Sequence, residues 1–415
     1  MAGKAIIGAT LIDGTGKSAQ VGSVVLVSGK RIEAVGSKGQ LEVPPDYEKV
    51  NAEGLFLLPG MVDAHVHLAH PAFIPGPFKG SQETYLALIA AHNVRTALQN
   101  GITTLRSVCD GGHMDLALRS AVRSGQMLGS RLFVAGKGIC MTGGHGSQMP
   151  GIMHEVDSED EMRKAVREEV KADVDLIKLL TSHRSDHPEL SQEEIIVGTR
   201  EAHRLGKRVA IHAGNFTGTR MAAAAGVDSI EHGNFIDEKT ADMMAEKGIY
   251  LVPTIWVYHF IAEKIEKMRQ GGGEYPMDAE EWQATMHWSQ RVVERYPETI
   301  RIIRERGIKV AAGTDNVFPG EPFAVLHREI EYLTRFGFSN MEAIEAATRV
   351  GAEVIGCEDE FGTVVIGKFA DLIMVERDPL EDITALKDVK WVMKEGLVIP
   401  LSPEYERQPI HSKRM

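Results

Sequence analysis

The middle of the chain alternates short apolar segments with longer amphipathic ones, and this alternation constrains the fold more than any other feature. Eight apolar segments have the length and composition of buried strands: 61–67, 102–108, 131–139, 176–180, 209–213, 229–232, 250–254 and 310–314. Amphipathic segments of helical length lie between them, and some begin with capping sequences such as Ser81–Thr84. This repetition predicts an α/β fold, a (β/α)8 TIM barrel over residues 59–360.

The two ends of the chain have a different pattern. Residues 1–58 and 361–415 contain short strand-like segments separated by turn sequences, for example 5–12, 23–27 and 370–375. Because these strand-rich ends flank the predicted barrel on both sides, we expect them to pair. The sequence therefore predicts a small β-sandwich domain built from both termini.

Charge and composition narrow the class of partner. The chain has 415 residues and a net charge of −12, with charges of both signs spread along it, which argues against nucleic acid or an anionic membrane as partner. The three cysteines form no CxxC pair, no signal-peptide h-region begins the chain, and no apolar run reaches the length of a membrane span. We expect a cytoplasmic protein that acts on a small molecule.

Metal-ligating side chains occur where the predicted barrel strands end. Because residues i and i+2 of a strand point to the same face, His65 and His67 can reach one ion. Five strands together contribute six such residues: His65, His67, Lys178, His212, His232 and Asp315. Each one alone has an ordinary explanation, such as a core histidine, a salt-bridged lysine or a helix cap. Because the carboxyl ends of barrel strands meet on one face, the whole set predicts a metal site there.

This arrangement resembles the amidohydrolase superfamily, in which HxH follows strand one, lysine lies on strand four, histidines end strands five and six, and aspartate follows strand eight. The segments 58–67 and 362–372 resemble that superfamily too. The resemblance implies two divalent ions, usually zinc, and a homo-oligomer. It also implies a ligand set, with His65, His67 and Asp315 on one ion, His212 and His232 on the other, and Lys178, carboxylated by carbon dioxide, across both.

The residue types suit hydrolysis. A water that bridges two cations loses a proton near neutral pH, and the resulting hydroxide can attack a polarised carbonyl. Asp315 would accept the proton and pass it to the leaving amine as a general acid and base. The sequence therefore predicts a hydrolase that cleaves a carbon–nitrogen bond.

The loop after strand three indicates the branch of the superfamily. Its glycines in Met141–Gly146 permit close approach of the backbone, so that His145 can lie over the site. The loop resembles that of imidazolonepropionase-like proteins and Xaa-Pro dipeptidases with a carboxylated lysine, in which the histidine contacts the substrate. This resemblance favours hydrolysis of an amide bond in a dipeptide (Xaa-Pro or Xaa-Arg/Lys) or an N-acyl amino acid.

Further residues are candidates for contact with the substrate. Arg184, with His183 beside it, could pair with a substrate carboxylate or could be a surface charge. Tyr258 and His259, which follow strand seven, are further pocket candidates, whereas His113 is a weaker one. Other histidines are assigned to surface or packing positions, His70 and His154 among them.

Several alternatives stay open at this point. The insertion 257–301 is either a cover over the barrel mouth or a surface helix pair. The substrate could instead be a cyclic amide, a phenylurea or a carbamate. A zinc deaminase would have no use for the strand-four lysine, and a non-catalytic scaffold would have no reason to keep all six ligand positions.

Overall fold

A computed structural model describes residues 3–70, 74, 80–149, 151–182, 185–269, 279–316 and 323–401. Its parallel strands are mostly buried, and all but the strand at 153–156 overlap the predicted apolar segments. They are β7 (Met61–Val66), β8 (Ile102–Ser107), β9 (Arg131–Val134), β10 (Gly138–Met141), β11 (Met153–Val156), β12 (Leu176–Leu180), β13 (Arg208–Ala213), β14 (Ser229–His232) and β15 (Tyr250–Val252). They form a sheet in the order β7-β8-β9 and another in the order β11-β10-β12-β13-β14-β15.

Backbone hydrogen bonds join these two sheets into a ring. The Asp175 N–H donates to the Val134 carbonyl (2.8 Å) and so connects β9 to β12. On the other side, the Leu251 N–H donates to the Lys309 carbonyl (3.0 Å), and the Ala64 N–H donates to the Ala312 carbonyl (2.9 Å). The segment 310–314 therefore occupies the position between β15 and β7 where the eighth strand was expected.

Two of the predicted strands differ from the structure. The segment 310–314 makes a single bridge, Leu251 to Val310, and is not a regular strand. The segment 131–139 is two strands, because the chain turns at Gly136, whose φ is 65°. The Gly136 N–H donates to Asp115 (2.9 Å) and the Lys137 N–H to Glu169 (3.1 Å), so side chains replace the strand partners at the turn.

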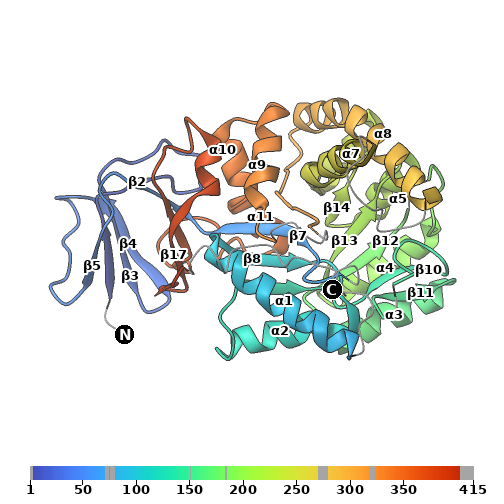
Figure 1. Cartoon of the computed structure of the whole chain (residues 1–415), viewed down its shortest axis with the longest axis horizontal. Coiled ribbons are helices and arrows are strands. Elements are labelled where there is room, and N and C mark those ends of the chain that lie inside the picture. Colours follow the sequence, from blue (N-terminus) through green and yellow to red (C-terminus); the bar gives the residue numbers. More distant parts are fainter. Residues whose placement is uncertain are drawn as a thin grey trace.

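The helices lie around the outside of the parallel strands (Figure 1). They are α1 (Gln82–Gln99), α2 (Met114–Arg123), α3 (Glu159–Lys171), α4 (Gln192–Arg204), α5 (Phe216–Ala225), α6 (Glu238–Lys247), α7 (Ile255–Arg269), α8 (Ala279–Glu305), α9 (Leu326–Arg335), α10 (Asn340–Ala346) and α11 (Arg349–Ile355). The predicted caps are present: Ser81 accepts from Thr84, and Ser191 forms a capping box with Glu194. None of the described helices combines the length and apolar character that a membrane crossing needs.

The strands from the chain ends form two further sheets, beside the ring (Figure 1). One contains β1 (Lys4–Ile7), β3 (Ser23–Ser28), β4 (Arg31–Ser37) and β5 (Glu48–Asn51), and the other contains β2 (Thr10–Leu11), β6 (Phe56–Pro59), β16 (Leu372–Val375), β17 (Val389–Lys394) and β18 (Leu397–Val398). Strand β6 pairs antiparallel with β16, so both ends of the chain share a sheet. One apolar cluster contains Ile6 of the first sheet and Leu57 and Leu372 of the second.

Candidate metal centre

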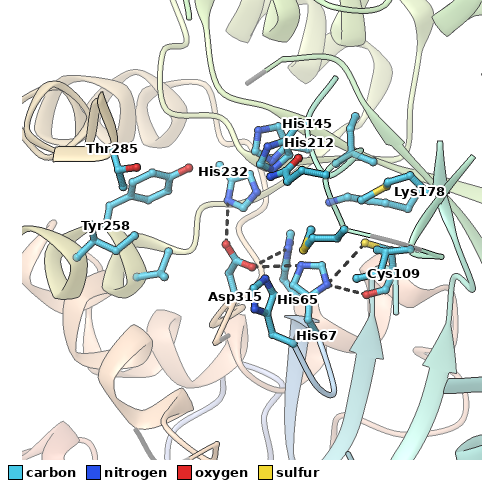
Figure 2. Close-up of a pocket in the computed structure, with 18 of the residues that line it drawn as sticks. His65, His67, Cys109, His145, Lys178, His212, His232, Tyr258, Thr285 and Asp315 are labelled. Atoms are coloured by element: carbon cyan, nitrogen blue, oxygen red, sulfur yellow. Dashed lines mark hydrogen bonds and ion pairs between the residues drawn. The ribbon is translucent and has the colours of Figure 1, made fainter. Parts of the chain in front are cut away.

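The six residues predicted to converge line one cavity of about 340 Å³ (Figure 2). Five of them lie at or near the carboxyl end of their segment: His65 of β7 and His67 directly after it, His212 of β13, His232 of β14, and Asp315 after the segment in the eighth position, whereas Lys178 lies in the middle of β12. The registers of β12 with β13 and of β13 with β14 place His212 opposite Leu180, and His232 opposite Ala213. Parallel pairing therefore brings residues far apart in sequence to one end of the ring.

The side chain of Asp315 lies among three of the histidines. Its Oδ1 atom is 3.5 Å from Nε2 of His65 and 3.3 Å from Nε2 of His67. Its Oδ2 atom is 4.0 Å from Nδ1 of His232. His65, His232 and Asp315 each offer a ligand atom within 4.8 Å of the others, which is a spacing that a single ion can bridge.

The remaining histidines continue this cluster. The ring of His212 lies 4.5 Å from that of His232, and the ring of His145 lies 4.4 Å from that of His212. Lys178 lines the same cavity from β12 and is 2% exposed. A buried lysine in a strand that is otherwise apolar is costly while charged, so its position indicates a chemical role or a close partner.

Contacts outside the cavity fix which nitrogen of each HxH imidazole faces it. The Nδ1 atom of His65 lies 2.7 Å from Oε2 of Glu231, and that of His67 lies 2.7 Å from the carbonyl oxygen of Cys109. Each acceptor requires a proton on Nδ1, so that Nε2 faces Asp315. In the neutral ring of His65 this leaves an Nε2 lone pair. Among the described atoms, Nε2 of His65 is buried and has no hydrogen-bond partner. A cation would satisfy it.

Beneath His65 lies a buried ion pair that the sequence analysis missed. Arg106 donates to both carboxylate oxygens of Glu231 (2.8 and 2.9 Å) and to the Ala64 carbonyl (2.5 Å), and Ser229 donates to Glu231 (2.5 Å). Arg106 is 2% exposed and Glu231 is fully buried. An arginine and a glutamate inside two predicted barrel strands were the signal that could have revealed this pair.

Buried carboxylates also hold the backbone around the HxH sequence. Asp63 accepts from the Thr314 N–H (3.0 Å) and the His65 N–H (3.2 Å), and so ties β7 to the eighth position of the ring. Asp110 accepts from the Leu68 N–H (2.9 Å) directly after the second histidine. Burial raises the pKa of Asp63 to about 7.

Left-handed backbone conformations concentrate at the same end of the ring. Four non-glycine residues there have positive φ: Cys109 (132°), His232 (66°), Thr254 (48°) and Asp315 (49°). Such conformations cost of order 1–3 kcal/mol each and persist where the surrounding structure enforces them. Their clustering is typical of a functional site.

Burial sets the protonation state of most of the cluster. It lowers the pKa of His65 to about 4 and that of His232 to about 3, and it lowers the pKa of Lys178. Burial alone would raise the pKa of Asp315, but the hydrogen bond with His67 and the neighbouring histidines lower it well below its usual range. The neutral imidazoles of His65 and His232 and the Asp315 carboxylate are donors for cations, and the lowered pKa of Lys178 favours its uncharged amine.

The other predicted residues divide into three groups. His145 and Tyr258 line the cavity, and the ring of Tyr258 lies 6.0 Å from that of His232. His183 and Arg184 lie outside the described residues. The insertion 257–301 supplies part of the cavity wall, from Val257, Tyr258 and Ile261 of α7 and from Thr285, Trp288 and Ser289 of α8.

Two candidate histidines lie outside the cavity, and one assigned elsewhere lines it. His259 is absent from the cavity lining and stacks on Tyr332 (4.5 Å) on the other side of α7. His113 is likewise absent, because its Nε2 atom is held 2.9 Å from Glu169. His70, which was assigned to surface or packing, lines the cavity because the N–H groups before it turn toward Asp110.

The chain is similar in sequence to known proteins. The sequence model of the Amidohydrolase family matches residues 56–399. The ochratoxinase of Aspergillus niger is 29% identical over 92% of this chain and 83% of its own length. The imidazolonepropionase of Pseudomonas putida is 24% identical over 88% of this chain and 90% of its own length.

A solved structure extends the comparison to three dimensions. A Xaa-Pro dipeptidase with bound methionine in its active site is 31% identical, covers 96% of this chain and 100% of its own, and superposes with a TM-score of 0.85. This likeness shows the α/β, TIM-barrel-like fold that the sequence predicted.

Proposed function

The chain belongs to the amidohydrolase family, which indicates a hydrolase of carbon–nitrogen bonds, and from that premise we propose that it cleaves an amide bond in a dipeptide or an N-acyl amino acid. One observation carries the proposal. The Nε2 atoms of His65 and His67 both lie within 3.5 Å of one oxygen of Asp315, at the floor of a cavity.

The donor set supports a site for two divalent ions, with zinc the expected metal. His65, His67 and Asp315 would hold one ion, because their ligand atoms already meet. His212 and His232, whose rings are 4.5 Å apart, would hold the other. Lys178 would bridge the two after carboxylation, since burial lowers its pKa and favours the uncharged amine that can add carbon dioxide.

When bound, the ions supply a water of lowered pKa and a polarised carbonyl. The residues of the chain then orient the substrate and move a proton. His145, whose ring lies 4.4 Å from that of His212, contacts the substrate beside the reacting carbonyl. Asp315 takes a proton from the attacking water and gives it to the leaving nitrogen, as the carbon–oxygen bond forms and the carbon–nitrogen bond breaks.

The order of the strands also supports the predicted organisation of the chain. We infer that the two sheets from the chain ends form the small β domain, because Ile6 of one and Leu57 of the other share an apolar cluster. The pairing of β6 with β16 brings residues before and after the ring into that domain.

A product screen on zinc-loaded protein, prepared with bicarbonate, tests the proposed function. The library holds Xaa-Pro dipeptides, N-acyl amino acids, aryl ureas and carbamates, and release of a free amino acid is expected. Turnover of ureas or carbamates alone would contradict the proposal and favour hydrolysis of a urea or carbamate instead. Full activity of Lys178→Ala or Asp315→Asn would contradict the assigned roles.

A further inference from the structure

The cavity has a polar floor and apolar walls. The floor is the histidine, lysine and aspartate cluster, which Figure 2 shows between Tyr258 and Thr285 on one side and Cys109 on the other. Apolar wall residues come from the segment after β10 and from the helix pair α7 and α8: Met149, Ile152, Met153, Val257, Ile261 and Trp288.

The charges of the lining argue against a cationic substrate side chain. Among the described lining residues, Asp315 is the only carboxylate, and it belongs to the candidate metal centre. The other polar groups of the two walls carry no formal charge: Gln148, Tyr258, Thr285 and Ser289. An ammonium or guanidinium group that entered the cavity would lose its hydration and gain no carboxylate partner in return. Such an uncompensated loss of hydration is costly in free energy. Bound divalent ions would add repulsion.

Trp288 is held as a rigid anchor in the helical wall. Its ring lies 5.4 Å from the ring of Phe235, and the guanidinium of Arg291 lies 5.0 Å over it. Arg291 in turn pairs with Asp186 (2.9 Å), in the segment that follows β12. Large aromatic side chains fixed in this way contribute strongly to the binding of apolar groups because little conformational freedom is lost.

We propose that the substrate carries a bulky uncharged apolar side chain, aromatic or aliphatic, next to the scissile bond, and that the cavity rejects lysine or arginine there. The proposal rests on the proposed amide hydrolysis and deepens it. Of the two dipeptide classes that the sequence left open, it keeps the apolar Xaa-Pro type and removes the Xaa-Arg/Lys type.

A near-isosteric pair of substrates tests the proposal. Nα-acetylnorleucine and Nα-acetyllysine share a four-carbon side chain and differ by the ammonium group at its end. The zinc-loaded protein should favour norleucine in kcat/KM by roughly 10- to 100-fold, as an unpaired buried charge implies. Equal rates, or preference for lysine, would overturn the proposal and leave amide hydrolysis standing.

Binding of non-hydrolysable analogues separates the two proposals. N-methylphosphonyl derivatives of norleucine and lysine place a tetrahedral phosphorus where the scissile carbonyl would lie, and their affinities need no turnover. Tighter binding of the norleucine analogue without hydrolysis of either acetyl substrate would support the apolar cavity and contradict hydrolysis of N-acyl amino acids. Equal affinities would contradict the apolar cavity, whatever the hydrolysis.

A negative charge placed in the wall should weaken the preference for norleucine. Ile261→Glu adds a carboxylate at a half-buried lining position and should raise the lysine-to-norleucine ratio about tenfold. Ile366→Glu is the matched control, because Ile366 is 61% exposed and absent from the lining. The same ratio in both variants would overturn the proposal. Trp288→Ala should lower kcat/KM for norleucine more than for lysine.

Discussion

Glu231→Gln tests whether the buried pair beneath His65 prepares that imidazole to bind metal. The Glu231 carboxylate accepts two N–H groups of Arg106 (2.8 and 2.9 Å), the hydroxyl of Ser229 (2.5 Å) and Nδ1–H of His65 (2.7 Å). A glutamine keeps one acceptor oxygen and turns an NH2 group toward the others. The variant therefore leaves the Arg106 charge without a carboxylate partner. It also places an N–H donor against the donors of its neighbours Arg106 and His65.

Two losses follow from this geometry, and each has a magnitude. Removal of one partner of a buried ion pair costs about 3–5 kcal/mol of unfolding free energy. A donor that faces Nδ1 of His65 moves the imidazole proton to Nε2, which removes the lone pair that faces Asp315. Loss of such an outer partner typically weakens metal binding by about 10- to 100-fold.

Zinc affinity and stability should be measured on the same preparations. Competition with a chromophoric chelator gives the affinity, and urea unfolding followed by circular dichroism gives the stability. Glu353→Gln is the control, because Glu353 pairs with Lys309 (2.6 Å) and Arg349 (2.5 Å) and is absent from the cavity lining. Folded Glu231→Gln protein with unchanged zinc affinity would refute the reasoning.

Three further predictions concern protons and packing. Burial alone would lower the pKa of His67, but contacts with Cys109 and Asp315 raise it well above 6.5. Zinc binding should therefore release protons and become tighter as pH rises. Calorimetry that finds a constant zinc affinity from about pH 6 to 8.5 would argue against this. Burial raises the pKa of Glu329 from 4.5 to about 8, so the folded protein holds a proton that the unfolded chain has lost, and stability should fall as pH rises through that range. From about pH 6 to pH 9, the thermal midpoint should therefore fall less in Glu329→Gln than in the unchanged protein. Equal falls in the two proteins would count against the prediction. Gly313→Ala would place a Cβ 2.7 Å from Cβ of His65. We therefore expect the free energy of unfolding to fall by about 1–3 kcal/mol and zinc binding to weaken. An unchanged zinc affinity would contradict the expected displacement of His65.

The convergence of the six polar residues could be predicted because it depends on periodicity alone. Apolar segments of strand length fixed where each strand ends, and a ring of parallel strands brings those ends together. The positions of His65 and Asp315, 250 residues apart in sequence, follow from this without any knowledge of side-chain contacts.

Contacts that depend on register or on loop paths could not be predicted. The pairing of Arg106 with Glu231 requires knowledge of which strands lie across the interior of the ring. The break at Gly136 and the inward turn of His70 both depend on carboxylates that accept backbone N–H groups from distant segments. Such long-range hydrogen bonds leave no periodic trace in the sequence.

A zinc titration of the metal-free protein tests the central claim most directly. Bound zinc and release of free amino acid from an N-acyl apolar amino acid are measured on the same samples, with bicarbonate present. The account predicts that hydrolysis is absent without metal, rises with bound zinc and saturates near two ions per chain, as the donors around Asp315 and Lys178 imply. Full hydrolysis by protein shown to contain no metal would contradict it.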